Sequence, residues 1–264
     1  MAESRYGFLA NTKDLSSVLY MTINVAQEYT ASSPVPVEYI GVWQRDLLET
    51  ATMKDVTTLV LWMQTNQYHI DIRIPASLAA ISAVHTLEDY NNKELLILAG
   101  QQGFAGITQV TPGTAKSSDL CQWHREIDFQ PQTDARDIGK MVFTDANTII
   151  ETGIDDVYLE VWRRLEDSQK PCLFKFTTGR NRKGLATPAY CMRAGNFIAY
   201  ARPRQISLPK IDSLINAIVT IKPARDKLLD WLDTEISFGD LIDEQHWKIK
   251  HSTLPFKQGL IVGL

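Results

Sequence analysis

The clearest pattern in this chain is a strict alternation of side-chain character. Residues 120–130 read LCQWHREIDFQ, and one face of an extended strand would carry Cys121, Trp123, Arg125, Ile127 and Phe129. Because side chains of a strand point alternately to its two faces, this segment predicts a β-strand with two unlike faces. Residues 68–75, YHIDIRIP, set isoleucines against polar side chains, and we expect the polar face of His69, Asp71 and Arg73 to meet solvent.

Strand-like segments recur along most of the chain and are separated by short turns. The expected strands span residues 39–48, 57–65, 68–75, 104–110, 120–130, 138–144, 148–153, 158–165, 171–177, 189–194, 196–202, 228–238 and 245–252. Helical spacing is found instead at residues 15–29, in an insertion at 76–102 and within 210–232, where 225–232 suits a helix or a strand. Regularly spaced strands with short polar turns are typical of an antiparallel barrel or sandwich.

We therefore predict a mainly β protein, an antiparallel barrel with a helical insertion and short terminal helices. An N-terminal extension would take residues 1–36, and a single barrel-like domain would take residues 37–264. The strands before and after the insertion would be two halves of one barrel, and two small sheets that share a core are the alternative. The sequence contains no glycine-rich phosphate loop and no regular strand–helix alternation, which argues against a nucleotide-binding parallel sheet.

Composition places the chain among ordinary globular proteins, because 44% of its 264 residues are hydrophobic and 22% are charged. Its three cysteines are an odd number without metal-ligand spacing, which predicts free thiols in a reducing compartment. We see no secretory leader and no run of about 18 apolar residues, so we expect a cytoplasmic protein. The net charge is −4, and the densest basic patch, Arg180, Arg182 and Lys183, indicates a solvated loop rather than a nucleic-acid site.

A Trp-x-Arg pattern occurs three times and supplies the candidate binding residues. The copies are Trp43/Arg45, Trp123/Arg125 and Trp162/Arg164. Residues two apart share a strand face, so converging copies would line a cavity with apolar walls and a few polar groups. The candidate ligand-binding residues are Trp43, Arg45, Gln64, Trp123, Arg125, Tyr158 and Trp162. The alternative is structural, because an arginine beside a tryptophan can stack on the ring or bridge to a carboxylate.

Candidate catalytic residues lie in the strand at residues 120–130 and in the strand at 158–165, and they are His124, Glu126 and Glu160. If the Trp123 face points inward, His124 and Glu126 point outward, and their spacing of about 7 Å along the strand is wide for shared metal ligation without a partner strand. If the strand is turned, His124 becomes a general base, since its ordinary pKa lies near neutrality. Register decides between the two arrangements, and we predict no metal site.

Short segments between residues 37 and 259 carry a resemblance to a known family. They read GVWQRDLLE, TTLVLWMQT, YHIDIRIP, FAGIT, CQWHREIDFQP, DIGKMVF and EVWRRL. Together they resemble a family of uncharacterised lipocalin-like proteins with a calycin-type β-barrel. The resemblance implies a ligand cavity inside a barrel and supplies no catalytic residue. Proteins of similar architecture include small-molecule carriers and cofactor-independent cyclases and isomerases. The Gly-x-Trp of the lipocalin signature has only a loose counterpart in Gly41-Val42-Trp43.

Two functions fit these observations. The first is an enzyme without a cofactor, a lyase, isomerase or cyclase, that acts on a small anionic or aromatic molecule inside the barrel. The second is a carrier or sensor with the same pocket and no chemistry. A protein-interaction module would instead show a filled interior and a large exposed apolar patch.

We expect a small-molecule partner, no nucleic acid and no membrane, and leave a homodimer open. The preference for an anion depends on charge pairing inside the barrel. It requires that Arg45 and Arg125 lack a full set of carboxylate partners, because a buried unpaired guanidinium would then be satisfied by the ligand.

Overall fold

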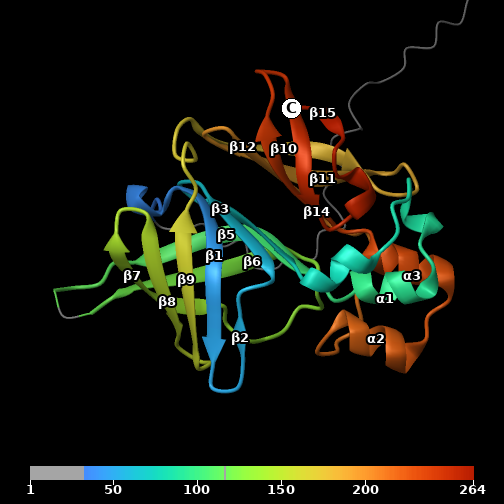
Figure 1. Cartoon of the computed structure of the whole chain (residues 1–264), viewed down its shortest axis with the longest axis horizontal. Coiled ribbons are helices and arrows are strands. Elements are labelled where there is room, and N and C mark those ends of the chain that lie inside the picture. Colours follow the sequence, from blue (N-terminus) through green and yellow to red (C-terminus); the bar gives the residue numbers. More distant parts are fainter. Residues whose placement is uncertain (1–32, 116) are drawn as a thin grey trace, which may run out of the picture. The chain divides into compact units, whose positions relative to one another are not determined.

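The computed structural model describes residues 33–115 and 117–264, so the helix expected at residues 15–29 lies outside the described residues. Within them, the chain folds as a closed antiparallel barrel, a separate six-stranded sheet and three α-helices (Figure 1). The predicted fold class, a mainly β protein with an antiparallel barrel, is therefore confirmed.

The barrel consists of eight strands in the described part of the chain, and a short strand, β2 (Lys54–Asp55), pairs with the end of β1. The eight are β1 (Gly41–Thr50), β3 (Leu59–Gln64), β4 (Tyr68–Ile74), β5 (Gln102–Thr111), β6 (Asp119–Asp128), β7 (Ile138–Asp145), β8 (Thr148–Gly153) and β9 (Tyr158–Arg164). Neighbouring strands pair antiparallel, and β9 pairs with β1 to close the barrel. In this closing pair Arg45 lies opposite Trp162, so two copies of the Trp-x-Arg pattern become neighbours.

The later strands form a second sheet. They are β10 (Cys172–Arg180), β11 (Ala186–Ala194), β12 (Phe197–Arg202), β13 (Glu235–Leu241), β14 (His246–Ser252) and β15 (Ile261–Gly263), paired antiparallel in that order. The expectation of one barrel therefore holds for the strands up to Arg164 and is wrong for those after it. The physical reason is closure, because the pairing of β9 with β1 leaves the barrel without a free edge for further strands.

Helices occupy the insertion and the segment before β13. They are α1 (Asn92–Leu98), α2 (Leu214–Ile221) and α3 (Arg225–Leu232), with short 3-10 turns η1 (Val37–Tyr39), η2 (Ala76–Ala80), η3 (Leu87–Asp89) and η4 (Pro255–Lys257). Asn91 caps α1, and Glu94 completes a capping box by accepting from the Asn91 amide. The helix ends at Leu98, because Gln102 already pairs with β4 as the first residue of β5.

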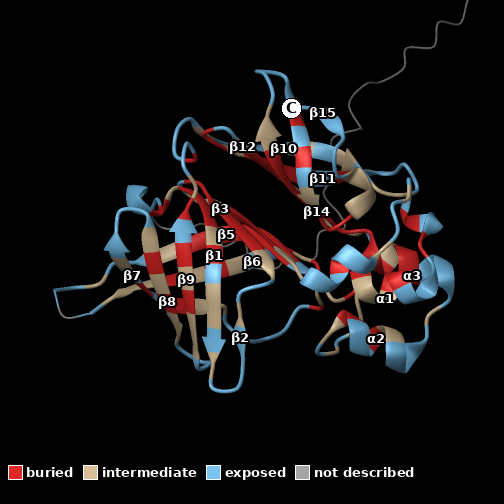
Figure 2. Ribbon diagram, viewed as in Figure 1, coloured by how far each residue is buried: buried red, intermediate tan, exposed pale blue. Residues whose placement is uncertain are grey.

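The second sheet packs against the outer, aliphatic face of the barrel strands. Ile70 and Ile72 of β4 share one core with Tyr190, Met192 and Phe238 of the second sheet. Figure 2 shows the buried residues along β3 and β5. The opposite face of β4 consequently points into the barrel, and the expectation of a solvent-facing His69, Asp71 and Arg73 is wrong. His69 and Asp71 are both buried, because neither face of this strand meets water.

A β-bulge interrupts the alternation of β6. Gly106 of β5 lies opposite Arg125 and Ala105 lies opposite Ile127, so Glu126 is an extra residue on β6. Beyond the bulge Ile127 joins the core between barrel and second sheet, instead of sharing the face of Trp123 as predicted. Gly106 permits the close approach of the two strands, since a Cβ there would overlap the His124 carbonyl oxygen.

Candidate functional site

Four tryptophans form the apolar half of the barrel interior, and Trp62 is the central one. Its ring centroid lies 6.2 Å from that of Trp43, 5.7 Å from Trp123 and 5.8 Å from Trp162. All four rings are buried and belong to one cluster contributed by β1, β3, β6 and β9. The three tryptophans of the repeated pattern therefore meet through a fourth, Trp62, that the pattern did not single out.

One pair of arginines faces the acidic side of the interior. Arg45 on β1 donates to Glu160 on β9 at 2.7 Å and to Asp55 at 2.8 Å, and its side chain is only 4% exposed. Arg73 on β4 makes a two-pronged contact with Asp71, with its Nε 3.0 Å from Oδ1. Both guanidinium groups are therefore paired with carboxylates of the barrel itself.

Arg125, at the end of β6, is paired in the same way. It donates to Asp137 at 2.7 Å and to Asp128 at 3.1 Å, and its guanidinium lies 3.7 Å above the centre of the Phe104 ring. Burial raises the pKa of Asp128, although the positive charge of Arg125 acts in the opposite direction. The condition set by the sequence for an anionic ligand, arginines without a full set of carboxylates, is not met by Arg45 and Arg125.

Glu151 on β8 differs from the other interior carboxyl groups. It accepts from the Tyr158 hydroxyl at 2.6 Å and from the Trp162 indole nitrogen at 3.0 Å, and the residue is 3% exposed. Burial, and next the negative charge of Glu160, raise the pKa of Glu151 to about 8. Burial and the neighbouring Glu151 also raise the pKa of Tyr158. This carboxyl group consequently holds its proton to a higher pH than an exposed glutamate does.

A cavity of about 290 Å³ lies among these side chains, at the end of the barrel where β1, β4, β6 and β8 finish. Its aromatic walls are Trp62, Phe104, Trp123, Tyr158 and Trp162. Its charged or ionisable walls are Asp71, Arg73, Arg125, Asp137, Glu151, Asp156 and Glu160. The exposed residues Asp156 and Val157 form part of its rim, so the cavity opens to solvent there. Aromatic walls with a few converging polar groups are typical of small-molecule sites.

The structure brings five of the ten sequence-predicted site residues to this cavity, and these are Trp123, Arg125, Tyr158, Glu160 and Trp162. Three others lie behind its wall. Trp43 packs toward the far end of the barrel, where its indole donates to the Tyr39 carbonyl. Arg45 supports Glu160 from behind, and Gln64 lies in a deeper polar layer, where its side-chain oxygen accepts from the Trp62 indole.

His124 and Glu126 are the two candidates on the other face of β6. The His124 ring lies 3.4 Å from the Gln109 side chain, and burial lowers its pKa. The Glu126 carboxylate accepts from the Tyr190 hydroxyl of the second sheet. The Trp123 face is therefore the inward one, and neither His124 nor Glu126 lines the cavity. Arg164, the third arginine of the pattern, instead donates to the backbone carbonyls of Ile40, Glu38 and Ala146.

Sequence reasoning missed several residues of the cavity wall, namely Trp62, Asp71, Arg73, Phe104, Asp137, Glu151 and Asp156. Asp71 and Arg73 belong to the polar face of residues 68–75, and the alternation in that segment predicts that this face meets solvent. Glu151 had a weaker signal, as a lone carboxylate on the same strand face as Ile149 in the β8 segment TIIETG. Asp137 precedes β7 in a loop, and no sequence pattern connects it with Arg125.

A polar relay lies one layer deeper than the cavity. Gln64 accepts from Thr108 at 2.7 Å, so the single hydroxyl hydrogen of Thr108 is committed there. The Thr108 oxygen, 3.0 Å from Nδ1 of His69, must therefore accept, and the neutral His69 carries its hydrogen on Nδ1. Burial lowers the pKa of His69, which keeps the ring neutral. This relay fixes the floor on which Phe104 packs, since the His69 and Phe104 rings meet edge to face at 5.6 Å.

Two other regions bear on function less directly. A second cavity of about 410 Å³ lies beside η2 and is mostly apolar, with His251 in its wall. The basic loop contains Arg182, whose charge is paired with Glu88 and with Asp230, and Lys183, which pairs with Asp230 at 2.8 Å. The described residues contain no group of three or more potential ligands that could hold a metal ion. No helix among them is long and apolar enough to cross a membrane.

Comparison with known proteins supports the fold alone. No protein family and no curated protein matches this sequence. An uncharacterized protein of known structure, YLR301w from Saccharomyces cerevisiae, is similar with a TM-score of 0.50 and 11% sequence identity. The match covers 80% of this chain and 84% of the yeast chain. The closed barrel is consistent with the calycin-like architecture implied by the resemblance, whereas no family match places the chain among the lipocalins.

Proposed function

We propose that the barrel binds a small organic molecule with an aromatic or similarly flat part in the cavity walled by Trp62, Trp123 and Trp162. The observation that carries this proposal is the cavity itself, which opens to solvent and combines large apolar rings with charged groups held in fixed positions. A filled interior, as expected of a purely structural barrel, would leave no such space. The ligand would lie against the indoles and meet Tyr158 and Glu151 at its polar end.

The binding test uses the full-length chain and two matched tyrosine variants. A set of small aromatic compounds is screened by ligand-observed NMR, and the affinity of each hit is measured for wild type, Tyr158→Phe and Tyr39→Phe. Tyr158 lines the cavity, whereas Tyr39 is a buried tyrosine of the same barrel whose hydroxyl donates to Asp119 outside the cavity. We expect Tyr158→Phe to weaken binding by about tenfold and Tyr39→Phe to leave it unchanged. Equal effects of both variants, or no hit at millimolar concentration, would contradict the proposal.

A second candidate function is a cofactor-independent enzyme, a lyase, isomerase or cyclase, and Glu151 is the observation that favours it. Its pKa of about 8 suits a group that donates and recovers a proton near neutral pH. Tyr158 holds this carboxyl group in place at 2.6 Å. Glu160, paired with Arg45, supplies a second carboxylate in the same cavity. The acid–base role is thus proposed for Glu151 together with Glu160. A carrier with the same cavity would need no proton transfer by either group.

The two candidates are separated by proton exchange in a bound ligand. Each hit is incubated with the protein in heavy water, and incorporation of deuterium at carbon is followed by NMR. An acid–base enzyme should accelerate exchange, and Glu151→Gln should abolish the acceleration while ligand binding persists. A carrier should bind the same compounds without accelerating exchange.

A further inference from the structure

The charges around the cavity do not balance. Its wall holds five carboxyl groups and two guanidinium groups, which belong to Asp71, Asp137, Glu151, Asp156 and Glu160 and to Arg73 and Arg125. Arg45, just behind the wall, brings the number of arginines to three. The ion-pair partners outside the wall add two more carboxylates, Asp55 beside Arg45 and Asp128 beside Arg125. Among the residues that the structure describes, acidic groups therefore outnumber basic groups around this space.

The imbalance is concentrated at Glu151. Arg73 is paired with Asp71, and Arg125 with Asp137 and Asp128, so the positive charge of each guanidinium is already matched by carboxylates. Glu151 receives hydrogen bonds only from the neutral groups of Tyr158 and Trp162 in the described structure. Its side chain lines the cavity although the residue is 97% removed from solvent, at 3% exposure. A positive charge in the cavity would find a buried carboxyl group without a cationic partner.

The aromatic walls act in the same direction. The faces of indole and phenol rings carry a negative electrostatic potential and attract organic cations. Trp62, Trp123, Trp162 and Tyr158 all contribute to the wall. We propose that the cavity takes an organic cation, a molecule with an ammonium group on a flat or apolar body, and that Glu151 is its counter-ion. This inference rests on the proposed function, since it names the class of ligand that the barrel binds.

Binding of such a cation should release a proton. The groups that face Glu151 are Glu160 and Tyr158 on β9, Asp137 before β7, Arg73 on β4 and Cys121 on β6. Because the pKa of Glu151 is raised to about 8, the group has to lose a proton to pair with an ammonium ion near neutral pH. The affinity for a cation should therefore rise with pH by up to about tenfold per unit until pH reaches about 8.

The test uses three probes of one shape and different charge, which are phenethylamine, 2-phenylethanol and phenylacetate. Their affinities for the full chain are measured by isothermal titration calorimetry in two buffers of different ionisation enthalpy. We expect phenethylamine to bind at least about tenfold more tightly than phenylacetate and to release about one proton at slightly acidic pH. The alcohol should bind without a proton signal.

Two variants locate the charge. Glu151→Gln should weaken phenethylamine by about tenfold and abolish proton release, while 2-phenylethanol changes by less than about twofold. Asp156→Asn alters an exposed rim carboxylate and should weaken the amine by only about twofold. If Glu151→Gln does not fold, the test rests on two measurements with wild type, which are proton release and the preference for the amine over the acid. The Asp156→Asn variant then shows whether a rim carboxylate accounts for them.

The outcomes separate this inference from the proposed function. If 2-phenylethanol or phenylacetate binds as tightly as the amine, the organic-cation inference is overturned and the binding cavity stands. If the amine binds best but Glu151→Gln does not weaken it, Glu151 is not its counter-ion and the inference is also overturned. If none of the three probes binds at millimolar concentration, both the inference and the binding of small aromatic molecules are contradicted.

Discussion

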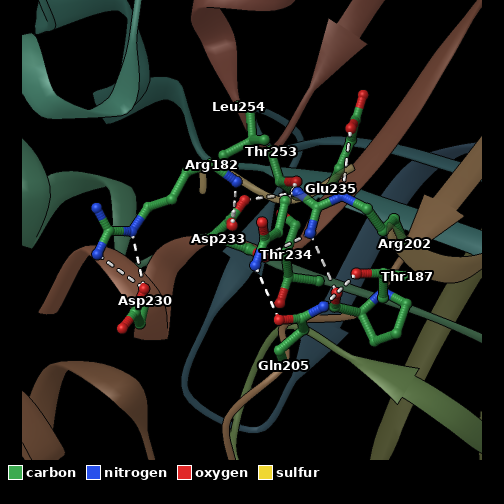
Figure 3. Close-up of polar contacts among 12 residues, drawn as sticks. Arg182, Thr187, Arg202, Gln205, Asp230, Asp233, Thr234, Glu235, Thr253 and Leu254 are labelled. Atoms are coloured by element: carbon green, nitrogen blue, oxygen red, sulfur yellow. Dashed lines mark hydrogen bonds and ion pairs between the residues drawn. The ribbon is translucent and has the colours of Figure 1, made fainter. Parts of the chain in front are cut away.

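Two regions of this protein bury arginine and carboxylate groups, and they do so differently. In the second sheet, Arg202 is 1% exposed and lies between Asp233 at 2.5 Å and Glu235 at 3.7 Å (Figure 3). Lys257 adds a second cation, 2.6 Å from Glu235. Two cations thus meet two carboxylates, and none of these four residues lines either cavity described above.

The barrel interior has the same residue types but a surplus of acid and an open space beside them. The Arg202 cluster joins β12 to the end of α3 and β13, and its charges are paired within the protein, although the Nε of Arg202 has no hydrogen-bond acceptor among the described residues. Around the barrel cavity no arginine or lysine of the described residues forms an ion pair with Glu151, and burial raises its pKa instead. The difference teaches that a buried ion pair by itself connects structural elements and does not indicate a ligand site. An unmatched buried carboxyl group beside a cavity, in contrast, indicates a candidate ligand site.

The largest expected effect is the loss of the cation at the balanced cluster. Arg202→Met would leave Asp233 buried without its main partner, and we expect it to lower the free energy of unfolding by about 3–5 kcal/mol. Denaturant unfolding of the variant beside wild type measures this loss. A change below about 1 kcal/mol would mean that water reaches Asp233 easily. The contrast between the balanced charges around Arg202 and the unmatched carboxyl group of Glu151 would then fail.

The fold that holds these two groups of charges could be predicted from the sequence only in part. Alternation located β4, β6 and β9 within a few residues, because side-chain period is a local property. The closure of β1 on β9 has no local signal, since the pairing joins residues more than a hundred positions apart, such as Arg45 and Trp162. Sequence reasoning therefore proposed a barrel correctly but extended it over strands that form a second sheet.

The candidate site was predicted in the same partial way. The Trp-x-Arg pattern brought Trp123, Arg125 and Trp162 to attention, and all three line the cavity. The pattern could not show that a second sheet would cover the aliphatic face of β4 and turn Asp71 inward, because that burial is a tertiary effect. It also could not show the partners of each arginine, on which the sign of the ligand charge depends.

The next prediction concerns the pH dependence of stability at Glu151. Its pKa is raised from 4.5 to about 8 in the folded chain, so over that interval the folded state holds a proton that the unfolded chain has lost. The contribution of Glu151 to stability is therefore complete at pH below about 4.5 and falls as pH rises to about 8, by at most about 1.4 kcal/mol per unit.

Glu151→Gln should remove this slope and leave a neutral side chain of the same shape. We expect the variant to gain stability relative to wild type as pH rises from about 5.5 to about 8.5, as measured by chemical denaturation at several pH values. Gln cannot titrate, and the difference between the two proteins isolates Glu151 from every other ionisable group. A difference that does not change with pH would show that this carboxyl group is already ionised in the folded barrel.

The smallest expected effect tests whether the balanced cluster needs its second cation. Lys257→Met removes a half-buried partner of Glu235, whose side chain is 6% exposed, and should lower the free energy of unfolding by about 1–2 kcal/mol. The matched control is Lys250→Met, which breaks an equally short pair, 2.7 Å to Asp240, between side chains that are 48% and 46% exposed. We expect the control to change stability by less than about 0.5 kcal/mol, because solvent screens exposed pairs.

Added salt should weaken the Lys250 pair further and leave the Lys257 pair nearly unchanged. Equal losses in the two variants would mean that Arg202, at 3.7 Å, already satisfies Glu235. Lys257 would then be a peripheral member of the cluster, and Arg202 alone would hold both carboxylates.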